Sequence, residues 1–263
     1  MGQVIPLILQ SPAFAGLPVI HGFTTRIEGV SPAPFNSLNF STSKGDKQEN
    51  VTANERILLK HLNLQSKPIV TTHQVHGKVV LHIDDTIQID STILIGENDA
   101  IITMRKGIII GIKTADCTPI LVYDGSTGAI AAIHAGWKGT ALRTAAHAIE
   151  SMKSRFGSKP GSLKAVIGPC IGKCCYVIGD EVINEFEKTF GGGSFIIRAG
   201  DDGGKRFTAD LQGANRQVLV DAGVPASNIF NINLCTACNP GLLFSHRRDA
   251  GMTGRHLNYI GRI

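Results

Sequence analysis

Three short segments of the chain bring together residue types that bind metals. Cys117, His76 and His134 stand in the segments ADCTP, QVHG and HAGWKG. A thiolate and two imidazoles suit Zn²⁺, and three protein ligands leave the fourth tetrahedral position open for water or substrate. A single Cys or His is more often a structural residue. It is therefore the combination that predicts a catalytic zinc site.

The other cysteines give a weaker metal signal. Cys235-x-x-Cys238 has ligand spacing, but Cys174 and Cys175 are adjacent and Cys170 stands apart. A second zinc site of the common type needs two matching pairs, which this spacing does not provide. We expect these cysteines to be buried, reduced thiols.

Rigid strands are needed to hold the three segments, and the sequence predicts them. Apolar and β-branched runs bounded by Gly, Pro, Asp and Asn are typical of strands. We expect strands at Val19–Thr25, Ile69–Val75, Val79–Ile83, Ala100–Thr103, Ile108–Lys113, Ile120–Tyr123, Ala129–His134, Leu163–Ile167 and Asn228–Asn233. Each metal-binding segment lies where one of these strands ends, and α/β proteins place their active sites at such positions.

Helices are fewer than strands. Apolar residues at helical spacing predict them at Leu142–Phe156, Glu181–Phe190 and Ala209–Ala222. Three strands lie between Ile108 and His134 without a helical crossover, so we predict an α/β fold with helices packed on a mixed sheet. A regular doubly wound fold is not expected. The stretch Ala199–Lys205 is expected to be a surface loop.

Composition is that of an ordinary globular protein. With 263 residues, 43% hydrophobic and 18% charged, residues 1–263 are expected to form a single elaborated domain. The net charge of +5 is spread along the chain, so nucleic acid is not an expected partner. The apolar N-terminal stretch is interrupted by Pro6, Pro12 and Pro18 and has no basic flank, which argues against a signal peptide and a membrane span. We expect a cytoplasmic protein.

A set of motifs, in this order, resembles the YfiH-like family, which is also described as laccase-domain or multicopper polyphenol oxidase proteins. The resemblance runs from about His21 to the C-terminus. The motifs are TTR-x-x-GVS (Thr24–Ser31), SLNF (Ser37–Phe40), QVHG (Gln74–Gly77), NDAIIT (Asn98–Thr103), ADC-x-P (Ala115–Pro119), HAGWKG (His134–Gly139), GPCI (Gly168–Ile171), SHRRD (Ser245–Asp249) and TGR (Thr253–Arg255).

The resemblance implies a fold, a metal and a reaction. It implies the α/β arrangement of the catalytic domain of cytotoxic necrotizing factor, with zinc held by His76, Cys117 and His134. It also implies phosphorolysis of adenosine, inosine and S-methyl-5'-thioadenosine, and deamination of adenosine at the same site. Zinc lowers the pKa of bound water toward neutrality, so hydrolytic deamination is chemically reasonable. The expected partners are nucleosides and phosphate, with no obligate protein partner.

These reactions need further residues. Arg26, Ser245 and Arg247 offer cationic and hydroxyl donors that could anchor phosphate or ribose, and a structural role is the alternative. Asn39 could contact a ribose or base edge, although it is as easily a turn residue. Asp116 could orient a metal ligand or carry a proton, with a strand-end salt bridge as the alternative.

Three other functions compete with this one. Copper oxidation of phenols is disfavoured because four-copper oxidases need His-x-His pairs, which the chain's nine histidines do not form. Cys117 beside a histidine could instead be the nucleophile of an amidase, and the resemblance implies peptidoglycan-precursor editing in some relatives. A non-catalytic nucleoside-binding module is the third alternative.

Overall fold

Two mixed β-sheets form the centre of the molecule. The computed structural model describes residues 6–191, 194–198 and 206–262, so the loop expected at Ala199–Lys205 lies outside the described residues. The first six-stranded sheet has the order β1 (Ile8–Leu9), β2 (Val19–Thr24), β15 (His256–Arg262), β7 (Ile109–Thr114), β3 (Ile69–His73), β5 (Ile93–Glu97). The second has the order β14 (Ile229–Asn231), β10 (Leu163–Ile167), β8 (Thr118–Asp124), β9 (Ile130–Ala135), β6 (Ala100–Thr103), β4 (Val80–Ile83).

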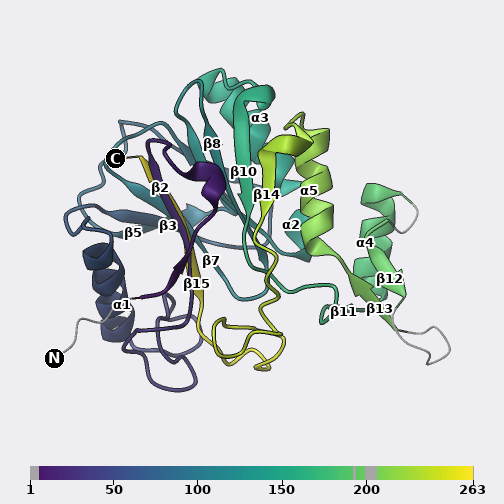
Figure 1. Cartoon of the computed structure of the whole chain (residues 1–263), viewed down its shortest axis with the longest axis horizontal. Coiled ribbons are helices and arrows are strands. Elements are labelled where there is room, and N and C mark those ends of the chain that lie inside the picture. Colours follow the sequence, from purple (N-terminus) through teal and green to yellow (C-terminus); the bar gives the residue numbers. More distant parts are fainter. Residues whose placement is uncertain (1–5, 192–193, 199–205, 263) are drawn as a thin grey trace.

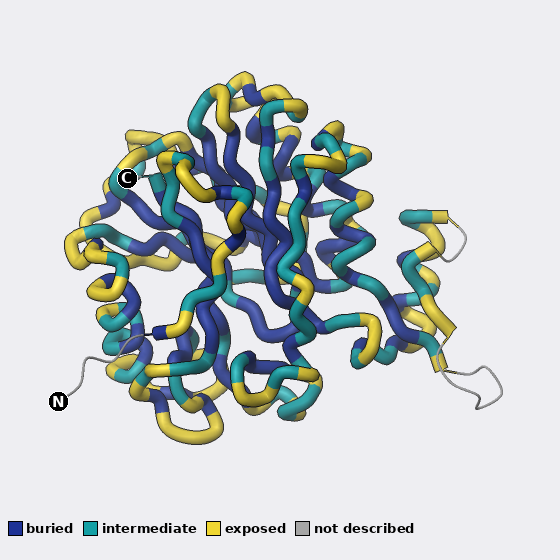
Figure 2. The backbone as a smooth tube through the Cα atoms, viewed as in Figure 1, coloured by how far each residue is buried: buried dark blue, intermediate teal, exposed yellow. Residues whose placement is uncertain are grey.

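The two sheets pack face to face, and helices cover their outer faces (Figure 1). Successive side chains of a strand point to opposite faces of the sheet, and in β8 (Thr118–Asp124) both faces are apolar. Leu121 and Tyr123 lie in the core between the sheets, whereas Ile120 and Val122 face the helices. Helices α3 (Thr144–Phe156) and α5 (Leu211–Asp221) cover the second sheet. Helix α1 (Gln48–His61) covers the first. Burial is accordingly concentrated in the strands (Figure 2).

A smaller unit projects from one side of this sandwich (Figure 1). Its three-stranded sheet has the order β11 (Val177–Ile178), β13 (Phe207–Ala209), β12 (Ile196–Arg198). Helix α4 (Asp180–Phe190) packs on this sheet through Val182 and Phe186. The short helix α2 (Trp137–Ala141) contacts α4 and so links the unit to the sandwich. The described residues also include the 3₁₀ segments Pro12–Phe14, Pro160–Ser162 and Ala226–Asn228.

The predicted fold class is confirmed, with one difference in architecture. Strands and helices interleave, and both large sheets mix parallel with antiparallel pairs. One mixed sheet was expected from the sequence, whereas the described residues form two large sheets and one small one. Two large sheets can pack on each other because alternate residues of strands such as β8 are apolar on both faces. Among the described residues, no helix is both long and apolar enough to cross a lipid bilayer.

Candidate active site

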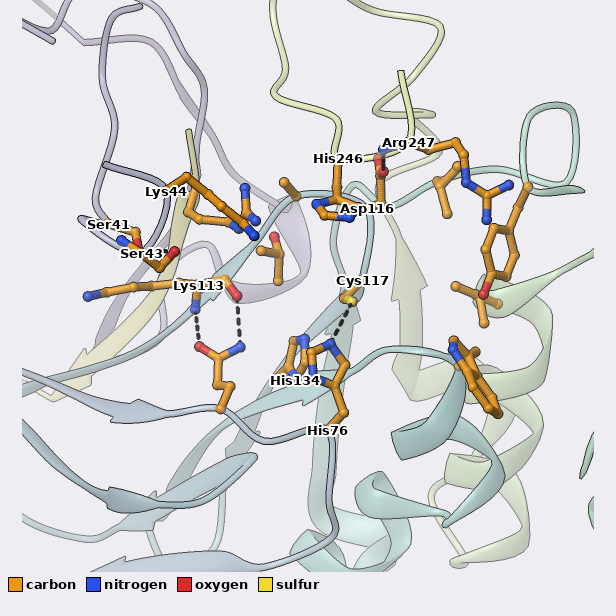
Figure 3. Close-up of a pocket in the computed structure, with 18 of the residues that line it drawn as sticks. Ser41, Ser43, Lys44, His76, Lys113, Asp116, Cys117, His134, His246 and Arg247 are labelled. Atoms are coloured by element: carbon orange, nitrogen blue, oxygen red, sulfur yellow. Dashed lines mark hydrogen bonds between the residues drawn. The ribbon is translucent and has the colours of Figure 1, made fainter. Parts of the chain in front are cut away.

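The three predicted metal ligands converge in the structure (Figure 3). Cys117 Sγ lies 3.8 Å from His76 Nε2, and one ligand atom of each of His76, Cys117 and His134 lies within 4.8 Å of the others. Sulfur and nitrogen ligands of one tetrahedral zinc ion lie about 3.5 Å apart. The spacing and the chemistry of this donor set therefore fit a single zinc ion.

Both large sheets contribute to this group. His76 follows β3 of the first sheet, Cys117 lies in the turn between β7 and β8, and His134 lies in β9 of the second sheet. His76 (φ 60°) and Asp116 (φ 90°) have left-handed backbone conformations. Such conformations are uncommon for residues with side chains and occur preferentially at functional sites. The two turns thus direct His76 and Cys117 toward a histidine fixed in a central strand.

Asp99 links the two histidine ligands. Its buried carboxylate accepts a hydrogen bond from His134 Nδ1 at 2.8 Å, which leaves Nε2 for a metal. It also accepts the backbone N–H groups of His76 (3.0 Å) and Gly77 (2.6 Å). These bonds lower the pKa of Asp99 against the opposing effect of its burial. Asp99 lies in the NDAIIT motif, but its role could not be predicted, because an acid beside a strand gives no local sign of its partner.

Gly136 leaves the space that the metal group needs. A Cβ atom at this position would lie 2.8 Å from Cys117 Sγ and 3.0 Å from His76 Cδ2. Both distances are shorter than ordinary van der Waals contacts. Gly136, the first glycine of HAGWKG, therefore allows Cys117 and His76 to pack beside it.

Cys117 and His134 form a charged pair. Burial opposes ionisation of Cys117, but the charge of His134 and hydrogen bonds from His134 and His76 lower its pKa to about 6. Burial also opposes protonation of His134, but Cys117 and Asp99 raise its pKa to about 9. The site thus favours a thiolate, the form of cysteine that binds metals and acts as a nucleophile. A bound cation would take the place of the imidazolium proton.

The metal group opens into a cavity of about 860 Å³. Trp137 and Tyr176 give the cavity wall two aromatic surfaces. Its cationic lining comes from segments far apart in sequence, namely Lys44, Lys113, Arg247 and Arg255. His246 also lines the cavity, where burial and neighbouring cations lower its pKa. Figure 3 shows Lys44 and Arg247 on opposite sides of the metal group. A cavity of this size and lining can hold an anionic or phosphate-bearing reactant beside an aromatic ring system.

Two of the remaining predicted site residues, Asp116 and Arg247, line this cavity. The Asp116 carboxylate accepts hydrogen bonds from the Thr236 hydroxyl and, at 2.6 Å, from the backbone N–H of Arg247. The Arg247 guanidinium lies over the Tyr176 ring at 5.1 Å and donates to the Val177 carbonyl. Asp116 therefore ties two loops together behind Cys117.

Arg26 is not among the residues that line the cavity. Its Nε donates to the Asn36 carbonyl at 2.7 Å, and its Nη1 donates to the Pro240 carbonyl at 3.0 Å. The guanidinium also lies over the Phe244 ring at 4.9 Å. Of the two roles considered for Arg26, the contacts favour the structural one.

Asn39 and Ser245 are likewise absent from the cavity lining, and both are fully buried. The Asn39 amide donates to the Asp46 carboxylate at 2.8 Å, and its oxygen accepts the Arg255 N–H at 2.8 Å. The Ser245 hydroxyl accepts the Arg248 N–H at 3.2 Å. These contacts favour the structural alternative for both residues, although His246 and Arg247, which follow Ser245 in the same motif, line the cavity.

Comparison with known proteins finds relatives along nearly the whole chain. A family model described as multi-copper polyphenol oxidoreductase laccase matches residues 20–263. The purine nucleoside phosphorylase YlmD of Geobacillus stearothermophilus is 36% identical over 256 residues, 96% of this chain and 92% of that protein. A protein named adenosine deaminase RL5, from an unknown prokaryotic organism, is 35% identical over 91% of this chain and 92% of its own length.

Solved structures show the same fold over the whole chain. The crystal structure of YlmD from Geobacillus stearothermophilus superimposes with a TM-score of 0.87 at 33% identity, covering 100% of this chain and 97% of that one. The YfiH protein of Bacillus licheniformis gives a TM-score of 0.88 at 32% identity, covering 99% of this chain and 97% of its own. The chain therefore belongs to the YfiH-like family, to which the multi-copper polyphenol oxidoreductase laccase model corresponds.

Proposed function

We propose that this protein is a zinc-dependent purine nucleoside enzyme. It cleaves adenosine, inosine and S-methyl-5'-thioadenosine with phosphate, and it deaminates adenosine to inosine. The observation that carries the proposal is the His76–Cys117–His134 group opening into a cavity with both aromatic and cationic walls. Relatives named purine nucleoside phosphorylase and adenosine deaminase support the same substrate class.

The cationic side chains suit phosphorolysis. In that reaction a phosphate oxygen bonds to the anomeric carbon while the carbon–nitrogen bond to the purine breaks, and the purine nitrogen takes up a proton. Lys44, Arg247 and Arg255 can hold the phosphate as charge-assisted donors from different walls of the cavity. Trp137 and Tyr176 offer ring faces to the purine.

The metal group suits deamination. Zn²⁺ held by His76, Cys117 and His134 supplies Lewis-acid chemistry at the position that the three side chains leave open. Asp99 keeps the His134 ring oriented with Nε2 toward that position. Zinc is favoured over copper because three ligands of this kind beside an open cavity are typical of hydrolytic zinc sites, whereas phenol oxidation by four coppers needs many more imidazoles.

A thiol amidase is the second candidate, and one observation favours it. The lowered pKa of Cys117, about 6, together with the His76 nitrogen 3.8 Å from its sulfur, is also what a nucleophilic cysteine requires. The two proposals differ in their response to metal removal. A thiol nucleophile works without metal and forms a covalent adduct, whereas the zinc enzyme loses activity to a chelator and recovers it with Zn²⁺.

Chromatographic product analysis tests the proposal. Metal-quantified protein is incubated with adenosine, with and without phosphate, beside Cys117→Ala and, as a control, the exposed His147→Ala. We expect adenine and ribose 1-phosphate only with phosphate, inosine in both conditions, and no product from Cys117→Ala. Zinc-loaded wild-type protein that binds nucleosides but forms no product would instead support the binding-module alternative.

A further inference from the structure

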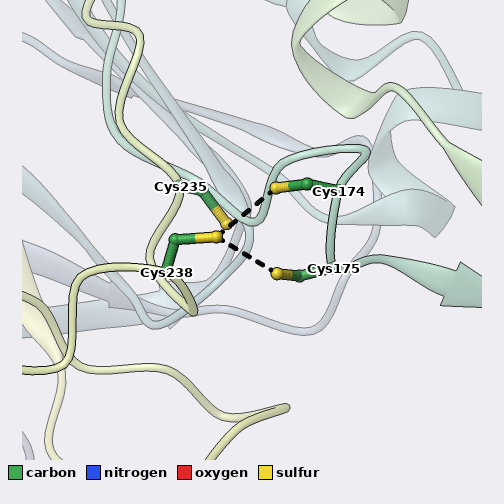
Figure 4. A group of neighbouring side chains, drawn as sticks. All are labelled: Cys174, Cys175, Cys235 and Cys238. Carbon is green, nitrogen blue, oxygen red and sulfur yellow. Dashed lines mark hydrogen bonds between the residues drawn. The ribbon is translucent and has the colours of Figure 1, made fainter.

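A second group of possible ligands lies outside the metal group of the candidate active site (Figure 4). Cys174 and Cys175 lie in the turn before β11, and Cys235 and Cys238 lie in the loop after β14. Their four Sγ atoms all lie within 4.8 Å of one another, although the two pairs are about sixty residues apart in sequence. The expectation of buried thiols is confirmed for Cys170 but is wrong for Cys174 and Cys238, which are exposed. Folding joins the two pairs, which the spacing in the sequence did not predict.

We propose that these four cysteines bind one Zn²⁺ ion as a structural site. Four thiolates complete a tetrahedral zinc shell, and Zn–S bonds of about 2.3 Å place the sulfurs about 3.8 Å apart. The Cys174–Cys238 and Cys175–Cys238 sulfurs lie 3.5 Å and 3.3 Å apart, close to this spacing. A shell of four protein ligands leaves no position for a substrate, so the site is structural rather than catalytic.

The backbone around the cluster is arranged for thiolate ligands. The Gly172 N–H donates to Cys235 Sγ at 3.2 Å, a contact that stabilises negative charge on sulfur. The Tyr176 N–H bonds the Gly172 carbonyl at 3.0 Å and closes the turn that carries the adjacent cysteines. A Cβ atom on Gly172 would lie 3.2 Å from Cys174 Sγ and 3.2 Å from Cys235 Cβ. A glycine at this position thus keeps the space between the two pairs free.

The cluster fastens one wall of the candidate active site. On one side, Cys175 precedes Tyr176, which lines the cavity beneath the Arg247 guanidinium. On the other, Cys235 precedes Thr236, whose hydroxyl donates to the Asp116 carboxylate beside Cys117. A zinc ion across the two pairs therefore fixes both the aromatic wall and the turn that carries Cys117.

Metal stoichiometry tests this inference without relying on activity. Chains purified anaerobically and with Zn²⁺ are analysed by native and elemental mass spectrometry. We expect two zinc ions in wild-type protein, one in Cys238→Ser, one in Cys117→Ala, and two in the control Cys170→Ala, whose cysteine lies outside the four-sulfur group. A single zinc ion in wild-type protein, or an unchanged zinc content in Cys238→Ser, would overturn the proposal.

X-ray absorption, which identifies the atoms bound to zinc, gives a second test. It uses a variant that keeps all four cysteines of the cluster, so the result does not depend on whether a variant lacking one of them folds. In Cys117→Ala, zinc X-ray absorption is expected to show four sulfur neighbours at about 2.3 Å and no imidazole. Nitrogen or oxygen neighbours in that spectrum would contradict a four-cysteine site. Mass spectrometry of freshly prepared wild-type protein under non-reducing conditions gives a further check. A mass lower by two hydrogens would mean that a disulfide has formed, and this result would also contradict the proposal.

Discussion

Asp99 shows how one residue can set the geometry of two metal ligands. Its carboxylate holds the ring of His134 and the backbone of the turn that presents His76. Asp99→Asn removes the charge that orients His134, so we expect zinc affinity at the candidate active site to fall by about 10- to 100-fold. Competition with a chromophoric chelator measures the change. The exposed Asp85→Asn is the matched control, and equal affinities in both variants would contradict this role.

Two arginines are expected to have different roles, one in phosphate binding and one in stability. Arg247 lines the cavity, whereas Arg26 bonds backbone carbonyls of two loops. We expect Arg247→Ala to raise the KM for phosphate by about tenfold, the effect of losing one charge-assisted hydrogen bond. Arg26→Ala should leave that KM unchanged and lower the free energy of unfolding by about 1–3 kcal/mol. Steady-state kinetics and urea unfolding of both variants check the pair, and the reverse pattern would restore Arg26 as a phosphate ligand.

At the scale of elements, the first residue of β15 is a buried histidine that makes stability depend on pH. His256 Nε2 accepts the Phe244 N–H at 2.8 Å, and burial lowers its pKa from 6.5 to about 3. The unfolded chain therefore binds a proton between these values that the folded chain does not. This contribution to stability is complete above about pH 6.5 and is lost as the pH falls toward 3.

We expect this single group to lower the free energy of unfolding by on the order of 2 kcal/mol between pH 7 and pH 5. Urea unfolding across this range should show a smaller pH dependence in His256→Gln, which keeps an acceptor but cannot be protonated there. The exposed His147→Gln serves as the control and should follow wild-type protein. Parallel pH profiles for wild-type protein and His256→Gln would show that His256 is not the titrating group.

Sequence patterns predicted most of the apolar strands and the amphipathic helices, although they missed β5, and they missed elements whose apolar pattern is interrupted. The strands Ala100–Thr103 and Leu163–Ile167 have the predicted bounds, and α4 begins one residue before its predicted start. Strand β15 was missed because His256 and Asn258 interrupt its apolar pattern, although both are buried and hydrogen-bonded. Helix α1 was missed because few of its residues are apolar, and even the buried set includes a polar residue, Asn54.

Some residues of the candidate site could be predicted from the sequence, and others could not. The metal ligands could be predicted because soft ligands in short motifs are rare and chemically specific. Partners that act across the fold could not, because nothing in the local sequence links Asp99 to His134 or Thr236 to Asp116. Arg26 and Ser245 were selected as donors by residue type, but their burial and bonding partners are set only by tertiary packing.

At the scale of the whole molecule, the core between the two sheets makes them a cooperative unit. Ile260 of β15 is fully buried there beside residues of both sheets. We expect Ile260→Ala to lower the free energy of unfolding by about 2–5 kcal/mol in one transition, because a cavity at this position weakens both sheets. Ile197→Ala, on the exposed side of β12, should change it by less than about 0.5 kcal/mol. Separate unfolding steps for the two sheets, followed by circular dichroism, would refute this coupling.

The position of β15 has a consequence for synthesis of the protein. This strand, His256–Arg262, lies between β2 and β7 near the middle of the first sheet, although it is the last strand described. The first sheet therefore lacks one of its inner strands until residues 256–262 have left the ribosome. The turn carrying Cys117 follows β7, the direct neighbour of β15, so a nascent chain has no finished metal site. We therefore expect the turn that carries Cys117 to reach its final position only after β15 has paired with β7.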